Sequence, residues 1–396
     1  MKTIELFAGA GGLGLGVAQA GFHPVQIVEW DRWCCDTIRE NRAKASGRLA
    51  GWPTPDEADI RGLDFSHQEG RVDLVTGGPP CQPFSLGGKH RAHADERDLW
   101  TETVRVVRQT KPKAFLFENV KGLTRSSFTE YFSYVLRQLT HPEIAPRAGE
   151  SWTAHLSRLE RHHSAKGAAG RGLSYNVLAR VLNAADYGVP QRRERVVFVG
   201  FRSDLGIEWS FPQATHALDA LLWDQVRSVA YWERNRVAKK DRSVAPRLAQ
   251  RAEKLLERPE GKAWITVREA LKGLPDPERS PKAASRIQSH RFQAGARSYP
   301  GHTGSPLDEA AKTLKAGVHG VPGGENMLCR KDGSIRYFSV RESARLQTFP
   351  DDYRFHGSWS ETMRQLGNAV PVQLAQILAK DVLAHLHAAS PDSLPK

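Results

Sequence analysis

The sequence is poor in cysteine and has no apolar run long enough to cross a membrane. Four of its 396 residues are cysteine. Their spacing fits neither a zinc site nor a disulfide framework. The chain opens Met1-Lys2-Thr3 and passes directly into a strand pattern, which is not how a signal peptide begins. We therefore expect a protein of a reducing cytoplasm that binds no metal and enters no membrane.

Acidic residues are also scarce relative to basic ones. The chain has 57 Lys and Arg against 44 Asp and Glu, a formal net charge of +13. The segment from Arg202 to Arg336 contains 24 basic and 16 acidic residues, so about +8 of the net charge lies there. An excess of this kind suits contacts with phosphate groups and predicts salt-sensitive binding to a nucleic acid.

The N-terminal residues have the pattern of a nucleotide-binding unit. An apolar strand, Thr3 to Phe7, runs into the glycine-rich stretch Ala8 to Gly16, which leads into a helix. A second strand, Val25 to Val28, ends at Glu29. Glycines let the backbone approach a ligand, and an acid about 20 residues after the first glycine can bind ribose hydroxyls. The same pattern serves nicotinamide oxidoreductases, although nothing else in this part of the chain calls for hydride transfer.

A second feature is a stiff loop that carries one cysteine. The run Gly77 to Ser85 contains Cys81 and three prolines, which fix φ and exclude a helix. Val72 to Val75 before it have the composition of a buried strand, so the loop presents its cysteine at the end of that strand. A fourth strand, Ala114 to Phe117, ends at Glu118, where a carboxyl group can act as an acid.

These features and three later ones resemble the bacterial cytosine-5 DNA methyltransferases of restriction–modification systems. The resemblance covers residues 1–125, 174–201 and 337–387 and follows the family's order. Its six motifs are Phe-Ala-Gly-Ala-Gly-Gly at Phe7 to Gly12, Pro-Pro-Cys-Gln at Pro79 to Gln82, Glu-Asn-Val at Glu118 to Val120, Gln-Arg-Arg-Glu-Arg at Gln191 to Arg195, the run Arg341 to Pro350, and Gly-Asn-Ala-Val-Pro at Gly367 to Pro371.

The resemblance implies a catalytic set of four residues. The Cys81 thiolate would add to carbon 6 of a cytosine, and carbon 5 would then attack the methyl group of S-adenosylmethionine. Glu118 would supply a proton or strong hydrogen bond at nitrogen 3. Arg195 would brace Glu118 and the cytosine carbonyl oxygen, and Arg193 would lie near the catalytic loop. The target base must flip out of the duplex to reach this set.

The resemblance also implies the S-adenosylmethionine site. Phe7 and Trp30 would enclose the adenine, and Glu29 would bind the ribose. Asp59 and Ile60 would touch the adenine edge. The methionine half would be lined by Gly9, Gly11, Gly77, Pro79, Asn368 and Val370.

The predicted fold is α/β, a doubly wound, Rossmann-like sheet with a second, smaller and irregular domain. We expect a catalytic and cofactor-binding domain over residues 1–201, a DNA target-recognition domain over 202–336, and a C-terminal segment over 337–396 that returns to the catalytic domain. Residues 147–172 depart from the family pattern and are predicted to be an insertion, either close to DNA or a solvated loop without a role.

The predicted partner is double-stranded DNA, methylated by a monomer that works beside a restriction endonuclease. Two alternatives remain at this point. A related family with the same catalytic core methylates transfer RNA, although the basic segment 202–336 favours DNA. A non-catalytic DNA-binding scaffold is the other alternative, and the intact Cys81, Glu118 and Arg195 argue against it.

Overall fold

The computed structural model describes residues 1–43, 49, 51–80, 99–165, 172–317 and 326–389. The chain divides into two compact units. The first unit contains Met1–Leu182, Glu194–Pro212 and Gln376–Lys396, and the second contains Asn183–Arg193 and Gln213–Ala375. These units divide the chain by packing, so the functional boundaries after residues 201 and 336 stay a prediction.

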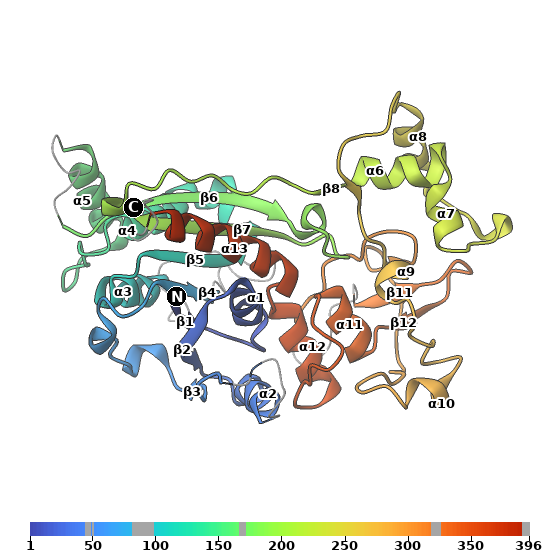
Figure 1. The fold of residues 1–396 in the computed structure, drawn as a ribbon, viewed down its shortest axis with the longest axis horizontal. Helices are drawn as coiled ribbons and strands as arrows, with labels where there is room; N and C mark the ends of the chain where they lie inside the picture. The colour runs from blue at the N-terminus through green and yellow to red at the C-terminus, as the bar shows by residue number, and fades with distance from the viewer. Residues whose placement is uncertain (44–48, 50, 81–98, 166–171, 318–325, 390–396) are drawn as a thin grey trace, which may run out of the picture. The chain divides into compact units, whose positions relative to one another are not determined.

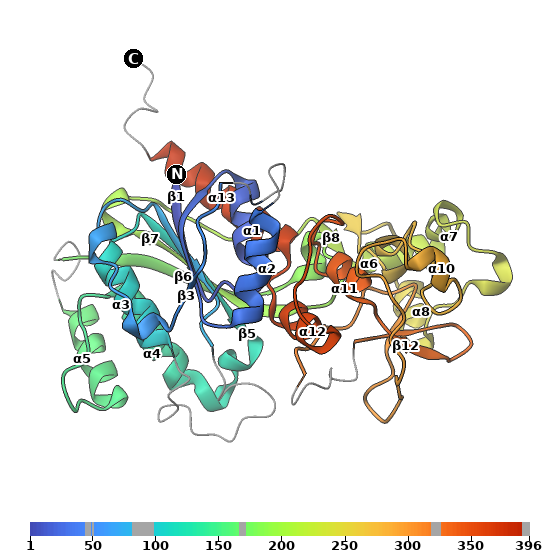
Figure 2. The ribbon, with the colours of Figure 1, turned by 90° about the horizontal axis from the view of Figure 1, so that it is seen from below.

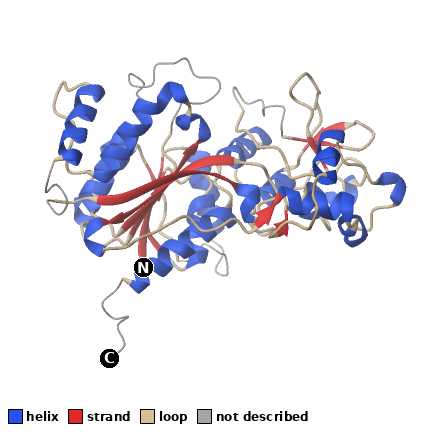
Figure 3. Cartoon of the chain, turned by 90° about the horizontal axis from the view of Figure 1, so that it is seen from above, coloured by secondary structure: helices blue, strands red, loops and turns tan. Residues whose placement is uncertain are grey.

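A seven-stranded sheet forms the centre of the first unit, in the order β3-β2-β1-β4-β5-β7-β6 (Figure 1), and its strands are red in Figure 3. Parallel pairing joins the first five of these strands, and β7 runs antiparallel to β5. The strands are β1 (Lys2–Leu6), β2 (His23–Glu29), β3 (Asp56–Glu57), β4 (Leu74–Gly77), β5 (Ala114–Val120), β6 (Tyr175–Asn183) and β7 (Glu194–Arg202). This arrangement confirms the predicted doubly wound sheet.

Helices cover both faces of this sheet (Figure 2). One face carries α1 (Gly12–Ala20) and α2 (Arg32–Arg42), and the other carries α3 (Trp100–Thr110) and α4 (Thr129–Thr140). The part of α13 (Val372–Ala388) that belongs to the first unit lies against α1, where Gln376 donates to the carbonyl oxygen of Gln19. The strands β1 and β4 are neighbours in the sheet, yet the helix that follows β1 (α1) and the helix that follows β4 (α3) lie on opposite faces. In such sheets, ligands bind at the carboxyl ends of the two strands where this reversal occurs.

Aromatic side chains fill the space between the sheet and α3 and α4. The ring of Trp100 meets Phe198 edge-on at 5.1 Å, and Phe115 stacks on Phe117 at 5.1 Å. Burial of such large apolar surfaces is the main stabilising contribution to the first unit.

The segment predicted to be an insertion is a helix where the structure describes it. Residues 152–164 form α5 (Trp152–Ser164), which begins at the capping side chain of Ser151. Its His155 is buried, and the two ring nitrogens lie 2.9 Å from the Tyr134 hydroxyl and 2.7 Å from the Ile144 carbonyl oxygen. The expectation of a solvated loop was therefore wrong for these residues, because α5 packs on α4 and extends the core.

The second unit has little regular structure. Its two small sheets join β8 (His216–Ala217) to β9 (Lys262–Ala263), and β10 (Ser305–Pro306) to β11 (Met327–Cys329) and β12 (Ile335–Tyr337). Its helices are short, and irregular chain with many Gly and Pro connects them, as the sequence predicted. They are α6 (Leu218–Leu222), α7 (Ala230–Arg234), α8 (Pro246–Glu253), α9 (Val267–Ala270), α10 (Pro281–Ala284), α11 (Val340–Leu346) and α12 (Trp359–Asn368). No helix among the described residues is long and apolar enough to span a membrane.

The packing of α1 on β1 makes a first prediction about stability. A Cβ atom added at Gly14 would lie 1.8 Å from a carboxyl oxygen of the buried Glu5, whereas a Cβ at Gly62 would meet no atom of the described chain within 4 Å. We expect Gly14→Ala to lower the free energy of unfolding by about 1–3 kcal/mol, the range for overpacking, although alanine favours helix elsewhere. Urea denaturation of Gly14→Ala beside Gly62→Ala checks this, and equal midpoints in the two variants would contradict it.

Candidate active site

The sheet brings several predicted site residues to one edge. In the parallel register Leu6 pairs with Gly77, and Gly77 pairs with Phe117. The glycine turn after β1, the loop after β4 and Glu118 on β5 therefore lie at neighbouring strand ends.

Glu29 organises the turn that follows β1. Its buried carboxylate accepts the backbone N–H of Gly9 at 2.7 Å, of Trp30 at 2.9 Å and of Asp31 at 2.8 Å. Burial raises the pKa of this carboxyl group, and the hydrogen bonds from Asp31 and Gly9 oppose that effect. Glu29 thus ties the end of β2 to the glycine turn, next to the place where a ribose was predicted.

The two predicted adenine walls differ in their surroundings. Phe7 is partly buried against the core and has φ of 53°, a conformation that a non-glycine residue rarely adopts. The indole of Trp30 is 69% exposed, which is unusual for a side chain of this size. Ile60 is buried, and Asp59 forms an ion pair with Arg61 at 2.6 Å, which holds the pKa of Asp59 below its ordinary value.

The loop after β4 is held from β5. Asn119 donates its amide to the carbonyl oxygen of Pro79 at 3.0 Å, and its own oxygen accepts the N–H of Val120 at 2.8 Å. Gly77 approaches β1 so closely that a Cβ there would lie 2.8 Å from the Leu6 carbonyl oxygen. These contacts hold the chain as far as Pro79. Cys81 itself, with the predicted catalytic loop that follows it, lies outside the described residues.

Glu118 and Arg195 form the charged pair of this edge. The Arg195 Nε lies 2.8 Å from Glu118 Oε1, and Glu118 is 7% exposed. The antiparallel register of β5 and β7 brings the two residues together, since Val120 pairs with Arg195. Glu118 Oε2 would lie 3.6 Å from a Cβ at Gly78, so the carboxyl group borders the backbone of the cysteine loop. The family resemblance predicted that Arg195 braces Glu118, and the two side chains are in contact in the structure.

Arg193 belongs to the second unit and contacts backbone there. Its buried guanidinium donates to the carbonyl oxygens of Leu314 at 3.1 Å and Gly367 at 2.9 Å. These contacts fix the start of the Gly-Asn-Ala-Val-Pro turn, which carries Asn368 and Val370. The structure thus gives Arg193 a bracing contact, and its predicted catalytic role stays a prediction.

Two buried glutamines complete this bracing, and sequence reasoning assigned them no role. Gln191 Nε2 lies 3.2 Å from Gln347 Oε1, and Gln191 Oε1 accepts the N–H of Leu314 at 2.9 Å. The Gln347 side chain donates to the carbonyl oxygen of Ala369 at 3.3 Å, and its backbone carbonyl oxygen accepts the N–H of Val372 at 3.1 Å. Gln191 lies in the motif Gln191 to Arg195, and Gln347 lies in the motif Arg341 to Pro350. An uncharged amide side chain within each motif was the only signal in the sequence for this bracing role.

Glu5 is a further residue that the sequence did not single out. Its carboxyl group is buried in β1 and accepts the N–H of Gly14 at 2.7 Å, while Oε2 has no hydrogen-bond partner among the described residues. Burial raises its pKa to about 8. At neutral pH the group is therefore mainly protonated in the folded protein.

This raised pKa predicts a pH dependence of stability. The folded protein keeps a proton on Glu5 up to a pH of about 8, whereas the unfolded chain loses it near the ordinary glutamate pKa of 4.5. The Glu5 contribution to stability is therefore complete below 4.5 and is lost as pH rises through about 8, with a slope of up to about 1.4 kcal/mol per pH unit. We expect Glu5→Gln, which cannot ionise, to remove this slope in urea denaturation between pH 5 and 8.5. The same slope in both proteins would contradict the protonated assignment.

Comparison with known proteins identifies the family of this chain. A sequence model of C-5 cytosine-specific DNA methylases matches residues 1–142 and 168–384. The chain is 33% identical to the type II methyltransferase M.PspPI of Psychrobacter sp. (strain TA137), over 99% of this chain and 81% of that protein. It is 30% identical to the type II methyltransferase M.Eco47II of Escherichia coli, over 96% of this chain and 78% of that protein.

Solved structures agree on the fold. A DNA modification methyltransferase encoded within an E. coli prophage superposes with a TM-score of 0.58 at 21% identity, over 98% of this chain and 99% of that one. The chain therefore belongs to the C-5 cytosine-specific DNA methylase family. It is a DNA cytosine-5 methyltransferase of the type II restriction–modification kind. The family match leaves out residues 143–167, which include α5. This gap in the match supports the prediction of an insertion here.

Proposed function

We propose that this enzyme transfers a methyl group from S-adenosylmethionine to carbon 5 of a cytosine within one short sequence of double-stranded DNA. The base flips out of the duplex, and Cys81 forms a transient covalent bond to it. The observation that carries the proposal is the pair between the buried Glu118 and Arg195, held at 2.8 Å beside a loop that Asn119 fixes at Pro79.

In the proposed reaction a thiolate adds to the base, the methyl group is transferred, and the thiolate then leaves. The Cys81 thiolate adds to carbon 6 of the cytosine, and Glu118 gives a proton or strong hydrogen bond to nitrogen 3 as electron density moves onto the ring. Carbon 5 then forms its bond to the methyl group while the methyl–sulfur bond of S-adenosylmethionine breaks, and the sulfur keeps that electron pair and would leave as the thioether S-adenosylhomocysteine. Loss of the carbon 5 proton to a base, departure of the thiolate from carbon 6 and return of the nitrogen 3 proton to Glu118 restore the aromatic ring. Arg195 keeps Glu118 oriented throughout.

The residues of the first unit fit S-adenosylmethionine. When bound, this cofactor would supply an electrophilic methyl group. The exposed indole of Trp30 offers a surface for an adenine. We assign the ribose hydroxyl groups to Glu29, whose carboxyl oxygens also accept the N–H groups of Gly9, Trp30 and Asp31. A Cβ added at Gly9 would meet no atom of the described chain within 4 Å, so open space borders the turn where a ligand would lie. The contributions of Asn368 and Val370 to this site stay a prediction.

A direct assay tests the proposed reaction and its alternatives. The purified protein is incubated with S-adenosylmethionine carrying a labelled methyl group and with either plasmid DNA or total transfer RNA. We expect label in DNA and none in RNA. Label in RNA alone would favour the transfer RNA alternative, and DNA binding without label would favour the non-catalytic scaffold.

The biological setting is part of the same proposal. Relatives of this chain carry the names of type II methyltransferases, so we propose that the methyl groups protect DNA from a partner restriction endonuclease. The monomeric state and the cytoplasmic location remain predictions. Size-exclusion chromatography with light scattering would measure the first of these.

A further inference from the structure

The second unit contains a long stretch without acidic residues. No Asp or Glu occurs between Glu278 and Asp308, although this stretch holds the basic residues Arg279, Lys282, Arg286, Arg291 and Arg297. It comprises α10 and irregular chain that leads toward β10, coloured gold to orange in Figure 1. Elsewhere in the second unit, acidic and basic residues are interspersed, so the stretch differs from its surroundings in the sign of its charge.

Four of these cations have no acidic partner. Lys282, Arg286, Arg291 and Arg297 are exposed and form no ion pair within the part of the chain that the structure describes. Other arginines of the same unit are paired: Arg268 lies 2.6 Å from Asp308, and Arg251 lies 2.6 Å from Asp219. Concentrated, uncompensated charge of one sign raises the electrostatic energy of the free protein. An anionic partner would relieve it.

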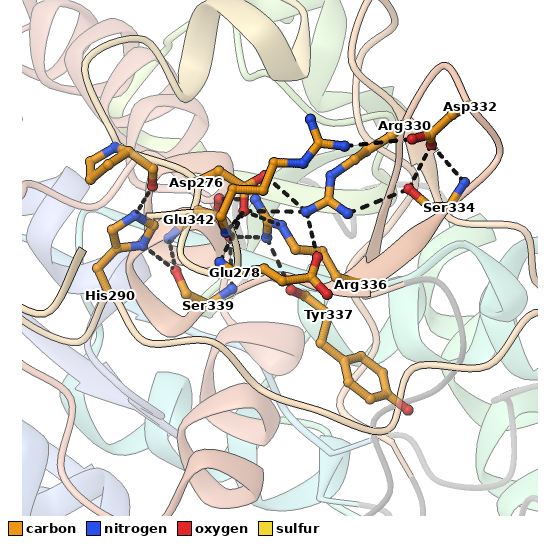
Figure 4. A network of polar contacts seen from close by, with 12 residues as sticks. Asp276, Glu278, His290, Arg330, Asp332, Ser334, Arg336, Tyr337, Ser339 and Glu342 are labelled. Atoms are coloured by element: carbon orange, nitrogen blue, oxygen red, sulfur yellow. Dashed lines mark hydrogen bonds and ion pairs between the residues drawn. The ribbon is translucent and has the colours of Figure 1, made fainter. Parts of the chain in front are cut away.

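A buried polar network anchors the middle of this stretch (Figure 4). His290 is fully buried, and its ring nitrogens lie 2.8 Å from the Ser339 hydroxyl and 2.6 Å from the Pro275 carbonyl oxygen. Ser339 caps α11 together with Glu342, and Glu342 forms a buried ion pair with Arg336 at 2.7 Å.

The same network reaches the residues that precede the stretch. Asp276 accepts from Arg330 at 2.9 Å, and Arg336 lies 3.4 Å from the same carboxyl group. Arg341 donates its backbone N–H to the Ser289 carbonyl oxygen at 3.0 Å. The chain is thus held before α10 at Asp276 and after α10 at Ser289 and His290, the residues that directly precede Arg291. A surface held in place in this way loses little conformational freedom when it binds.

Two exposed aromatic side chains lie among the cations. Phe292 is 41% exposed and Tyr299 is 49% exposed. A tight turn through Pro300 and Gly301 brings the Tyr299 ring to 4.2 Å from the His302 ring. Aromatic side chains interleaved with arginines are typical of surfaces that contact nucleic acids.

We infer that residues 279–303 are a DNA-contacting surface of the second unit, on which Lys282, Arg286, Arg291 and Arg297 bind backbone phosphates of the duplex. This inference rests on the proposed function and adds to it the residues that supply the phosphate contacts. Phosphate contacts fix register on the duplex, and the turn at Tyr299 to His302 is then held against the DNA.

The test measures how DNA affinity depends on salt. Each phosphate contact contributes about 0.9 to the slope of log K against log salt concentration. In the variant with Lys282, Arg286, Arg291 and Arg297 changed to glutamine, we expect the slope for duplex DNA to be smaller by about 3 to 4. The variant with only Arg291 and Arg297 changed should lose about half as much.

A matched control removes the same number of charges elsewhere in the second unit. Arg236, Lys239, Arg247 and Lys254 are also exposed and unpaired among the described residues, and they lie outside the acid-free stretch. Changed to glutamine, they should leave the slope near that of the parent protein. Equal slopes in the parent and in the 282/286/291/297 variant, or equal losses in both quadruple variants, would overturn the inference.

The parent protein distinguishes this failure from failure of the proposed function. If the parent methylates DNA but the quadruple variant keeps its salt slope, only the surface is wrong. If the parent neither binds nor methylates DNA, both proposals fall. Thermal unfolding of every variant confirms that the exposed substitutions leave the fold intact.

Discussion

Replacement of Cys81 by alanine is expected to abolish methyl transfer while DNA affinity stays within about threefold. The thiolate is the only group in the proposed reaction that bonds to carbon 6, and without it carbon 5 remains a poor nucleophile. We expect a loss of turnover of at least about 10⁴-fold, since loss of a covalent nucleophile acts on this scale. The measurement is single-turnover transfer of labelled methyl groups to plasmid DNA, with DNA binding measured by fluorescence anisotropy.

Cys329→Ala is the matched control for this variant. Cys329 is partly exposed in β11, and its thiol lies 3.6 Å from the carbonyl oxygen of Arg330. This variant should keep full activity. Turnover by Cys81→Ala at the rate of the control would contradict covalent catalysis by Cys81.

Glu118→Gln is expected to have the second-largest effect. Glutamine keeps the shape of the side chain and can still border the cysteine loop, but it cannot pass a proton to nitrogen 3 of the base. A positioned general acid contributes about 10²–10⁴-fold, so we expect kcat to fall by that factor. The KM for S-adenosylmethionine should change little, because Glu118 acts on the base.

Loss of an ion pair must be separated from loss of catalysis in this experiment. Glu150→Gln breaks the Arg158–Glu150 pair, which has a contact of 2.6 Å in the same unit but belongs to the α5 segment. Its kcat should equal that of the parent, because the pair lies outside the proposed site. A Glu118→Gln variant with parental kcat would remove Glu118 from the mechanism.

Local patterns were enough to predict the part of the fold that carries the chemistry. The strand, glycine turn, helix and strand from β1 to β2 follow from short-range signals: apolar runs, glycines at positive φ, and Gly21 as the residue that ends α1. The contact of Arg195 with Glu118 could be predicted only through the family resemblance. The two residues are far apart in the sequence, and the register of β5 and β7 brings them together.

The helix α5, which the sequence analysis did not predict within the insertion, also has a physical explanation. Residues 152–164 are rich in His and Arg, a composition that suggests a solvated loop. Yet Ser151 caps the helix, and Leu156 and Leu159 stand three residues apart on the face that packs inward. The capping Ser151 and the spacing of Leu156 and Leu159 were therefore the features of the sequence that indicate a helix here. The contacts of Gln191, Gln347 and Arg193, in contrast, join segments more than 100 residues apart, and no local pattern predicts such contacts.

Bisulfite sequencing of plasmid DNA from cells that express this chain tests the central claim most directly, beside cells that express Cys81→Ala. Methylated cytosines resist conversion and are read at single-base resolution. The account predicts protected cytosines at one position of one short motif in the parent sample and none in the Cys81→Ala sample. Full conversion of every cytosine in both samples, with both proteins expressed and folded, would contradict it.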